Sequence, residues 1–276
     1  MNGLYQQIKG GITMLKVEIQ EEITDILFHA EKEQREIKKF VDQYPELTID
    51  VAYTIQESLI KRKCTEENTV ISGWKLGLTS KAKQQMMGVH EPSYGVLLQN
   101  MELHPSEPIS IAPFIHAKIE PEIAFVLKKD LAGPVVTVAD VLDATDYVIA
   151  AMEIIDSRYE NFNFTLPDVI ADNSSSSRYI LGKTKHSVAE IDLEQMGIVF
   201  KKNGDVCSTT TAASVMGNPA RAVAWMANKL LARGQKVQAG EVVLSGALTG
   251  AETIQIDDTF TVSFDGLGEF DVTFTK

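Results

Sequence analysis

The chain has 276 residues, and 44% of them are hydrophobic, so we expect a sizeable core and no overall disorder. Its formal net charge is −12, from 26 Lys and Arg against 38 Asp and Glu, which excludes the basic excess that attracts nucleic acid or anionic lipid. The two cysteines lie far apart, and no run of apolar residues is long enough for a signal peptide or a membrane span, so we expect a cytoplasmic protein without disulfides, nucleic acid or membrane partners.

The first part of the chain predicts two helices. From about residue 15 to residue 44, apolar residues recur at helical spacing among Glu, Gln and Lys, until Pro45 ends the pattern. A second apolar stripe runs from Val51 to Ile60. Residues 1–68 are therefore expected to form a helical subdomain. Met14 offers a second start, which would leave residues 1–13 as a tail.

Beyond Thr65 the chain changes to short apolar runs separated by Gly, Pro and Ser, which is typical of a sheet-rich domain. The predicted strands are 70–78, 94–98, 118–127, 147–155, 197–201, 241–248, 259–264 and 269–274. Helices are predicted at 80–87, 138–145 and 220–233, with caps at Ser80, Thr137 and Asn218. The fold class is α+β, in which the helical subdomain 1–68 precedes a domain, 69–276, whose mixed sheet curls or closes into a barrel.

Two carboxylates lie at alternate positions of the predicted strand 118–127. Side chains of a strand alternate between faces, so Glu120 and Glu122 share one face and repel each other unless they share a proton or a cation. A third carboxylate, Glu153, lies in the similarly apolar strand 147–155. Three carboxylates without nearby Cys or His suit Mg²⁺ or Mn²⁺. The alternative is the solvated face of an amphipathic strand, and this local pattern alone favours that alternative.

Lys75 lies in an apolar strand between Gly73 and Gly77. Glycines allow a backbone or a ligand to approach closely. A lysine buried there needs an anion or loses its charge. The alternative, a side chain that snorkels to the sheet edge, is equally compatible with the local pattern.

The polar segment 156–162 follows Glu153 at once and contains Arg158 and Tyr159. The guanidinium of Arg158 could receive a substrate carboxylate in bidentate fashion. The alternative for Arg158 is a salt bridge to Asp156 or Glu160.

Two further segments could face a ligand. Asp172, Asn173 and Ser174 open a polar cluster that continues to Arg178, although an ordinary turn explains such a cluster too. The strand 241–248 ends in small residues, which can offer free backbone N–H groups or form a turn. No Ser/His/Asp arrangement, phosphate loop or dinucleotide fingerprint is present.

One family shares this order of motifs. The chain resembles the 2-keto-4-pentenoate hydratase and 4-oxalocrotonate decarboxylase family, within the fumarylacetoacetate hydrolase-like superfamily, in the segments 73–80, 91–97, 118–124, 153–162, 168–174 and 244–248. Two departures are visible. Pro121 replaces a frequent alanine between the two glutamates, and Asn218 replaces a usual histidine before Pro219. The first change removes a strand N–H but leaves both carboxylates.

The resemblance implies a site, an ion and an assembly. Magnesium, with manganese as an alternative, is expected on Glu120, Glu122 and Glu153, with Lys75 as a catalytic residue beside the metal. The implied substrate-binding residues are Leu78, Tyr159, Asp172, Asn173, Ser174, Gly246, Ala247 and Leu248. The resemblance also implies a homo-oligomer, together with a complex with the hydratase of the same pathway.

Within the family, segments 76–83 and 156–162 look more like the decarboxylase branch. The expected reaction is decarboxylation of 2-oxohex-3-enedioate to 2-hydroxypenta-2,4-dienoate in the meta-cleavage catabolism of aromatics. The alternatives are a hydratase acting on that product or on a related dicarboxylate, and, more remotely, a non-catalytic binding protein. The expected substrate carries a second carboxylate, which needs a donor such as Arg158, Tyr159 or a serine of the 174–177 cluster. Arg158 is taken as a catalytic residue, and if it binds that carboxylate, Arg158→Ala is expected to raise KM for the six-carbon diacid far more than for a five-carbon monoacid.

Overall fold

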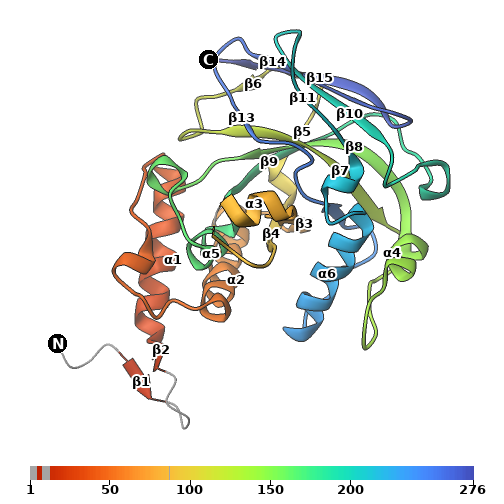
Figure 1. Cartoon of the computed structure of the whole chain (residues 1–276). Coiled ribbons are helices and arrows are strands. Elements are labelled where there is room, and N and C mark those ends of the chain that lie inside the picture. The colour runs from red at the N-terminus through yellow and green to blue at the C-terminus, as the bar shows by residue number, and fades with distance from the viewer. Residues whose placement is uncertain (1–4, 8–12, 87) are drawn as a thin grey trace.

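The computed structural model describes residues 5–7, 13–86 and 88–276, and its helices gather below two β-sheets (Figure 1). Helices α1 (Val17–Lys32) and α2 (Ile49–Glu66) form the N-terminal part, and β1 (Tyr5–Gln7) pairs with β2 (Thr13–Leu15). Residues 1–4 and 8–12 of the expected tail, and Met87 of the expected helix 80–87, lie outside the described residues.

The prediction of one helix from 15 to 44 was wrong in its second half. Helix α1 ends at Lys32, and Gln34 adopts a positive φ of 53°. Beyond it the chain is extended, because Ile37 pairs with the backbone of the segment that follows β8: its N–H donates to the carbonyl of Arg158 at 2.8 Å, and its carbonyl accepts from Glu160 at 2.9 Å. This pairing with residues about 120 positions away overrides the local helical pattern.

The larger sheet carries the site, and its strands run in the order β4-β3-β12-β7-β8-β9-β5, with β13 also paired to β7. The strands are β3 (Ile71–Gly77), β4 (Ser93–Leu98), β5 (Glu102–Leu103), β7 (Lys118–Leu127), β8 (Thr145–Ile155), β9 (Ser176–Leu181), β12 (Val242–Leu244) and β13 (Glu252–Thr253). The long strands β7 and β8 pair antiparallel over their full length at the centre. Strand β7 has the predicted bounds 118–127, and β8 begins two residues before the predicted 147–155.

A second sheet lies over the larger one on the side away from α1, α2 and α6 (Figure 1). Its order is β11-β10-β14-β15-β6, and its strands are β6 (Ile109–Ser110), β10 (Gly197–Lys202), β11 (Asp205–Thr211), β14 (Thr259–Phe264) and β15 (Gly268–Thr275). Rings of Phe200, Phe260 and Phe274 pack against one another inside it. The curled mixed sheets confirm the predicted α+β class.

The remaining helices are α3 (Lys81–Met86), α4 (Val138–Ala144), α5 (Leu166–Ala171) and α6 (Pro219–Ala232). The side chains of Thr137 and Asn218 cap α4 and α6, as predicted. The sequence did not predict α5, which has only six residues. The Asp168 carboxylate accepts hydrogen bonds from the backbone N–H and the hydroxyl of Thr165 at 2.9 and 2.6 Å, which fixes the start of this helix.

The N-terminal helices are joined to the rest of the fold by buried polar contacts. The Gln56 amide on α2 donates to the carbonyls of Tyr94 and Ile170 at 3.0 and 2.9 Å. The division at residue 68 therefore stays a prediction. Within the described ranges, no helix is long and apolar enough to cross a membrane.

Candidate active site

Three carboxylates meet on one face of the β7–β8 pair. Glu120 on β7 lies directly opposite Glu153 on β8, and Glu122 lies one alternate position along β7. One carboxylate oxygen from each of the three lies within 4.8 Å of the others. The side chains are buried, at 6%, 0% and 0% exposure. The solvated-face alternative was therefore wrong.

Some carboxylate oxygens of the cluster have no hydrogen-bond partner among the described residues. The Gly246 N–H donates to Glu122 Oε2 at 2.6 Å, and Lys75 Nζ lies 3.0 Å from Glu153 Oε2. Glu122 Oε1 and Glu153 Oε1 are buried and have no hydrogen-bond partner in the described part of the chain. Because buried anions need compensation, these oxygens fit a hard divalent cation.

The same crowding shifts the acidity of the cluster. Burial, with the charges of Glu153 and Glu120, raises the pKa of Glu122 well above its ordinary value. Burial also raises the pKa of Glu153 to about 7, although Lys75 opposes the shift. These shifts apply to the metal-free protein.

We expect magnesium affinity to rise with pH between about 5 and 8. In the folded apoprotein, the pKa values of Glu122 and Glu153 lie above the unfolded value of 4.5. The neutral carboxyls therefore stabilise the folded apoprotein at low pH. This stabilisation is lost as the pH rises towards 7. Magnesium needs the ionised form and must displace those protons. Calorimetric titration at pH 6 and pH 8, in buffers of different ionisation enthalpy, measures affinity and proton release. Equal affinity at both pH values with no proton release would contradict this electrostatic description.

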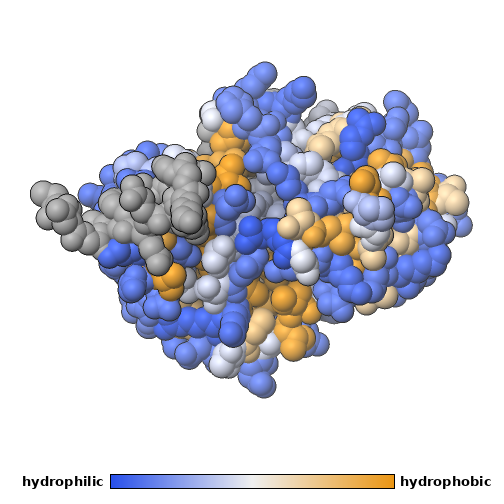
Figure 2. All heavy atoms as spheres, turned by 90° about the horizontal axis from the view of Figure 1, so that it is seen from below, coloured by the Kyte–Doolittle hydropathy of each residue, from blue (hydrophilic) through white to orange (hydrophobic). Residues whose placement is uncertain are grey.

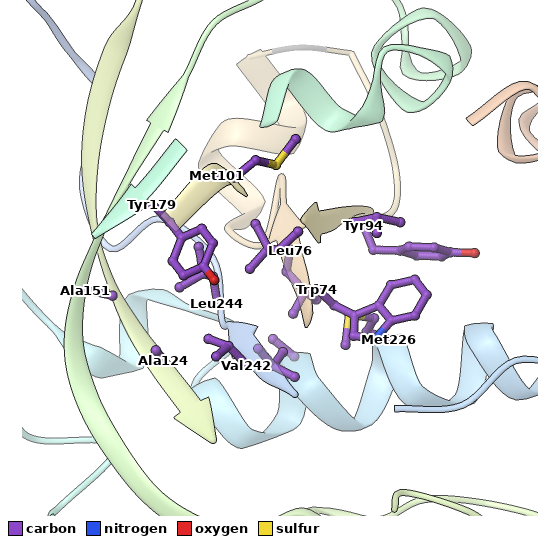
Figure 3. Close-up of a cluster of buried hydrophobic side chains, with 14 of the residues drawn as sticks. Trp74, Leu76, Tyr94, Met101, Ala124, Ala151, Tyr179, Met226, Val242 and Leu244 are labelled. Carbon is purple, nitrogen blue, oxygen red and sulfur yellow. The ribbon is translucent and has the colours of Figure 1, made fainter. Parts of the chain in front are cut away.

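Lys75 reaches this cluster from β3. Its neighbours Trp74 and Leu76 lie in the cluster of buried hydrophobic side chains in Figure 3, and alternation sends Lys75 to the opposite face. Lys75 is 2% exposed, and its Nζ donates to the Ser174 carbonyl at 2.9 Å. The snorkelling alternative was therefore wrong. Burial works against its charge, but Glu153 and Glu120 raise the pKa of Lys75 above its ordinary value, so it is an ammonium at neutral pH.

Gly95 on β4 creates the room that Lys75 needs. It pairs with Lys75 in the sheet. A Cβ at this position would lie 2.6 Å from the Asn173 carbonyl oxygen and 3.0 Å from Lys75 Cδ. Because a Cβ does not approach a backbone oxygen as closely as 2.6 Å, the neighbouring turn can pack here only against glycine.

The turn at Asn173–Ser175 presents polar groups to the same region. All three residues have positive φ, between 49° and 56°, which is a strained conformation of the kind found at functional sites. The Asn173 amide holds the turn by two hydrogen bonds to the backbone of Val96, so this side chain is not directed at a ligand. Ser174 and Ser175 line the cavity, and the buried Ser175 hydroxyl has no hydrogen-bond partner among the described residues.

A cavity of about 350 Å³ opens beside the carboxylates. Its lining combines polar groups, among them Lys75, Glu120, Ser174 and Ser175, with apolar side chains. The lining residues include Leu78, Ser93, Lys118, Ile155, Phe162, Phe164, Val169, Gly250 and Ala251. Leu78, which the resemblance implied as a substrate-binding residue, lines this cavity, and its contact with substrate stays a prediction.

The segment 246–248 lies behind the carboxylates. The Leu248 N–H donates to the Pro121 carbonyl at 3.0 Å, and the side chains of Ala247 and Leu248 are buried. The Gly246 N–H holds Glu122 in place. This segment thus positions a carboxylate, and substrate contact by these three residues stays a prediction.

Arg158 is not among the residues that line this cavity. Its buried guanidinium pairs with the Asp172 carboxylate through Nε, and its other nitrogens donate to the carbonyls of Asp172 and Asp156 at 2.6 and 2.7 Å. The Tyr159 hydroxyl donates to the Asp168 carbonyl at 2.9 Å. The geometry does not support substrate contact by Arg158, Tyr159 or Asp172, because internal partners occupy their polar groups. The ion-pair alternative was right in kind, but the partner is Asp172.

We expect Arg158→Met to destabilise the fold. Burial opposes the charge of Arg158, but Asp172 and Glu31 raise the pKa of its guanidinium above the ordinary value. Removing one partner of a buried ion pair leaves an uncompensated charge and costs about 3–5 kcal/mol. Urea unfolding measures the loss, with exposed Arg221→Met as the control. Unchanged stability together with a raised KM would restore the substrate role predicted from the sequence.

The sequence analysis gave no role to Lys118, Phe162 and Phe164, which line the cavity. Lys118 carried a usable signal, because it shares the strand face of Glu120 and Glu122. The two phenylalanines gave none, since they follow β8 in an irregular segment.

The comparisons with known proteins agree with this geometry. Residues 60–275 match the family model described as fumarylacetoacetate hydrolase, C-terminal. The chain is 42% identical to a 4-oxalocrotonate decarboxylase of Pseudomonas putida, over 89% of this chain and 93% of the relative. It is 38% identical to a 2-hydroxyhexa-2,4-dienoate hydratase of Comamonas testosteroni, over 91% and 95%.

A solved structure resembles the whole fold. The 4-oxalocrotonate decarboxylase from Pseudomonas putida G7, complexed with magnesium and adipate, superposes with a TM-score of 0.90 at 39% identity. The match covers 95% of this chain and 99% of that chain. With its curled sheets, its buried carboxylates and these relatives, the chain belongs to the fumarylacetoacetate hydrolase family.

Proposed function

We propose that the chain is a lyase that decarboxylates 2-oxohex-3-enedioate to 2-hydroxypenta-2,4-dienoate, with Mg²⁺ held by Glu120, Glu122 and Glu153. The observation that carries the proposal is the buried carboxylate triad with Lys75 beside it, of which Glu120 and Lys75 line a cavity. The identity of 42% to a 4-oxalocrotonate decarboxylase supports this reaction. The relative complexed with magnesium and adipate, a six-carbon diacid, supports the ion and the substrate length.

The reaction moves one electron pair along a conjugated chain. The C5–C6 bond breaks, its electrons form the C4–C5 double bond, and the existing double bond shifts to C2–C3. Negative charge reaches the 2-oxo oxygen, which takes a proton, while C6 leaves as carbon dioxide. A bound Mg²⁺ would supply Lewis-acid stabilisation of that charge.

The protein groups of the cavity have separate tasks. The Lys75 ammonium lies among the carboxylates and can hold a proton for the 2-oxo oxygen. The free hydroxyl of Ser175 can donate to the carboxylate at C1. The apolar side chains of Ile155, Phe162 and Phe164 keep water from the departing carboxylate.

A hydratase is the second candidate, because two relatives at 38% identity are named hydratases. A hydratase would bind the 2-oxo acid end of its substrate in the same way. The test is incubation of the magnesium-loaded protein with 2-oxohex-3-enedioate and, separately, with 2-hydroxypenta-2,4-dienoate. The proposal expects carbon dioxide from the diacid and slow or no hydration of the dienoate. Rapid hydration without carbon dioxide release would replace it with the hydratase.

The proposal extends to the setting of the enzyme. Manganese is an alternative ion because it shares the oxygen ligands of magnesium. We also propose that the enzyme is a cytoplasmic homo-oligomer that acts in aromatic catabolism. It would form a complex with the hydratase that consumes its product. Exposed apolar side chains such as Val70, Ile71 and Val206, and the separate hydrophobic patches in the view of Figure 2, are consistent with subunit contacts.

A further inference from the structure

Lys118 is the second cation of the cavity in the described part of the chain. It lies on β7 two positions before Glu120, so both side chains are on the same strand face. Its Nζ lies 4.1 Å from the centroid of the Phe162 ring. Among the described residues, no carboxylate forms an ion pair with Lys118, whereas Lys75 is engaged by Glu153 and the Ser174 carbonyl. Lys118 therefore offers a positive charge that the protein leaves for an incoming anion.

Phe162 is held beside Lys118 by a strained segment. Asn161 and Phe162 both have positive φ, 56° and 54°, which is rare for an aromatic residue. The Asn161 N–H donates to Glu36 at 3.3 Å, and the Phe162 ring lies 4.6 Å from the His116 ring. Strain of this kind persists where the surroundings enforce it, often at ligand sites. Here it places an aromatic face under the ammonium.

We propose that Lys118 is a specificity-determining residue that binds the second carboxylate of a six-carbon dicarboxylic 2-oxo acid. This inference rests on the proposed function, in which the triad end of the cavity takes the 2-oxo acid group. Residues two positions apart on a strand have Cα atoms about 6–7 Å apart. The end carboxyl carbons of an extended six-carbon diacid are about 6 Å apart, because five bonds of about 1.5 Å zigzag between them. The span of the substrate is thus close to the spacing of the Glu120 and Lys118 positions along β7.

The chemistry of the reaction predicts how Lys118 acts. Lys118 binds the carboxylate that departs, and this carboxylate loses its negative charge as carbon dioxide forms. The ammonium therefore attracts the ground state at least as strongly as the transition state. An interaction of that kind lowers KM without raising kcat. Lys118 selects diacids over monoacids and gives no acceleration to the bond-breaking step.

The kinetic test compares Lys118→Met and Lys118→Arg with wild type, and its control is Lys128→Met, at an exposed lysine just beyond the opposite end of β7. For 2-oxohex-3-enedioate we expect Lys118→Met to raise KM by about tenfold or more, with kcat unchanged or higher. Lys118→Arg should restore most of the loss, and Lys128→Met should behave as wild type. A KM within twofold of wild type, or a parallel fall in kcat with KM unchanged, would overturn the proposal.

A binding test separates this inference from the proposed reaction. Calorimetry on the magnesium-loaded protein compares adipate with hexanoate, which has the same length but one carboxylate. Wild type should prefer adipate, and Lys118→Met should lose that preference. If wild type releases no carbon dioxide while the preference depends on Lys118, the proposed reaction fails and the diacid subsite stands. If wild type is active and Lys118→Met keeps the preference, the subsite is wrong.

Discussion

Glu122→Gln is expected to remove magnesium binding and turnover together. The carboxylate is fully buried, lies within 4.8 Å of two others and accepts the Gly246 N–H. An amide keeps the shape but loses the charge that a divalent ion needs, so both affinity and activity should fall by more than about 100-fold. The metal-free variant should be more stable than metal-free wild type near pH 8, because one of three repelling anions is gone.

The measurements are calorimetric magnesium titration, turnover and thermal unfolding of the apoprotein. Exposed Glu107→Gln is the control, since it makes the same chemical change away from the cluster. Wild-type turnover by Glu122→Gln after exhaustive chelation would show that the triad holds no catalytic metal.

The second large effect is expected from Lys75→Met. This change nearly preserves the volume of a side chain that is 2% exposed, and it removes the ammonium next to Glu153. If Lys75 supplies the proton for the 2-oxo oxygen, turnover should fall by roughly 100-fold or more. Magnesium affinity should hold or rise, since a competing cation has left the carboxylates.

The combination distinguishes Lys75 from a metal ligand. If Lys75→Met loses turnover but still binds magnesium, Lys75 takes part in the reaction. If the variant loses both turnover and magnesium binding, Lys75 maintains the structure of the metal site. A variant with unaltered kinetics across pH 6 to 9 would reduce Lys75 to a structural counterion.

The strands that build the site were predictable because their patterns are long and apolar. The paired strands β7 and β8 each carry continuous hydrophobic runs, and alternation alone placed Glu120 and Glu122 on one face. The register that sets Glu120 opposite Glu153 was not accessible, because it depends on pairing between distant segments. Burial of the triad, which decides between a metal site and a solvated face, follows from that register.

Other features were not predicted correctly because they depend on tertiary contacts. The Arg158 guanidinium has the same chemistry whether it meets a substrate or Asp172, and only the fold brings Asp172 to it. The polar strand β11 lacks the apolar alternation that marks a strand. Lys118 was visible on the strand face, but its Phe162 partner comes from an irregular segment with no periodic signal.

The most direct test of the proposed reaction is release of labelled carbon dioxide from 2-oxohex-3-enedioate carrying ¹³C in one carboxyl group. The magnesium-loaded protein should release ¹³C-carbon dioxide from substrate labelled at C6 and none from substrate labelled at C1, because the C1 end stays with the triad. Release should stop on chelation and in Glu122→Gln. Label released from C1, or no labelled carbon dioxide from either substrate, would contradict the proposed function.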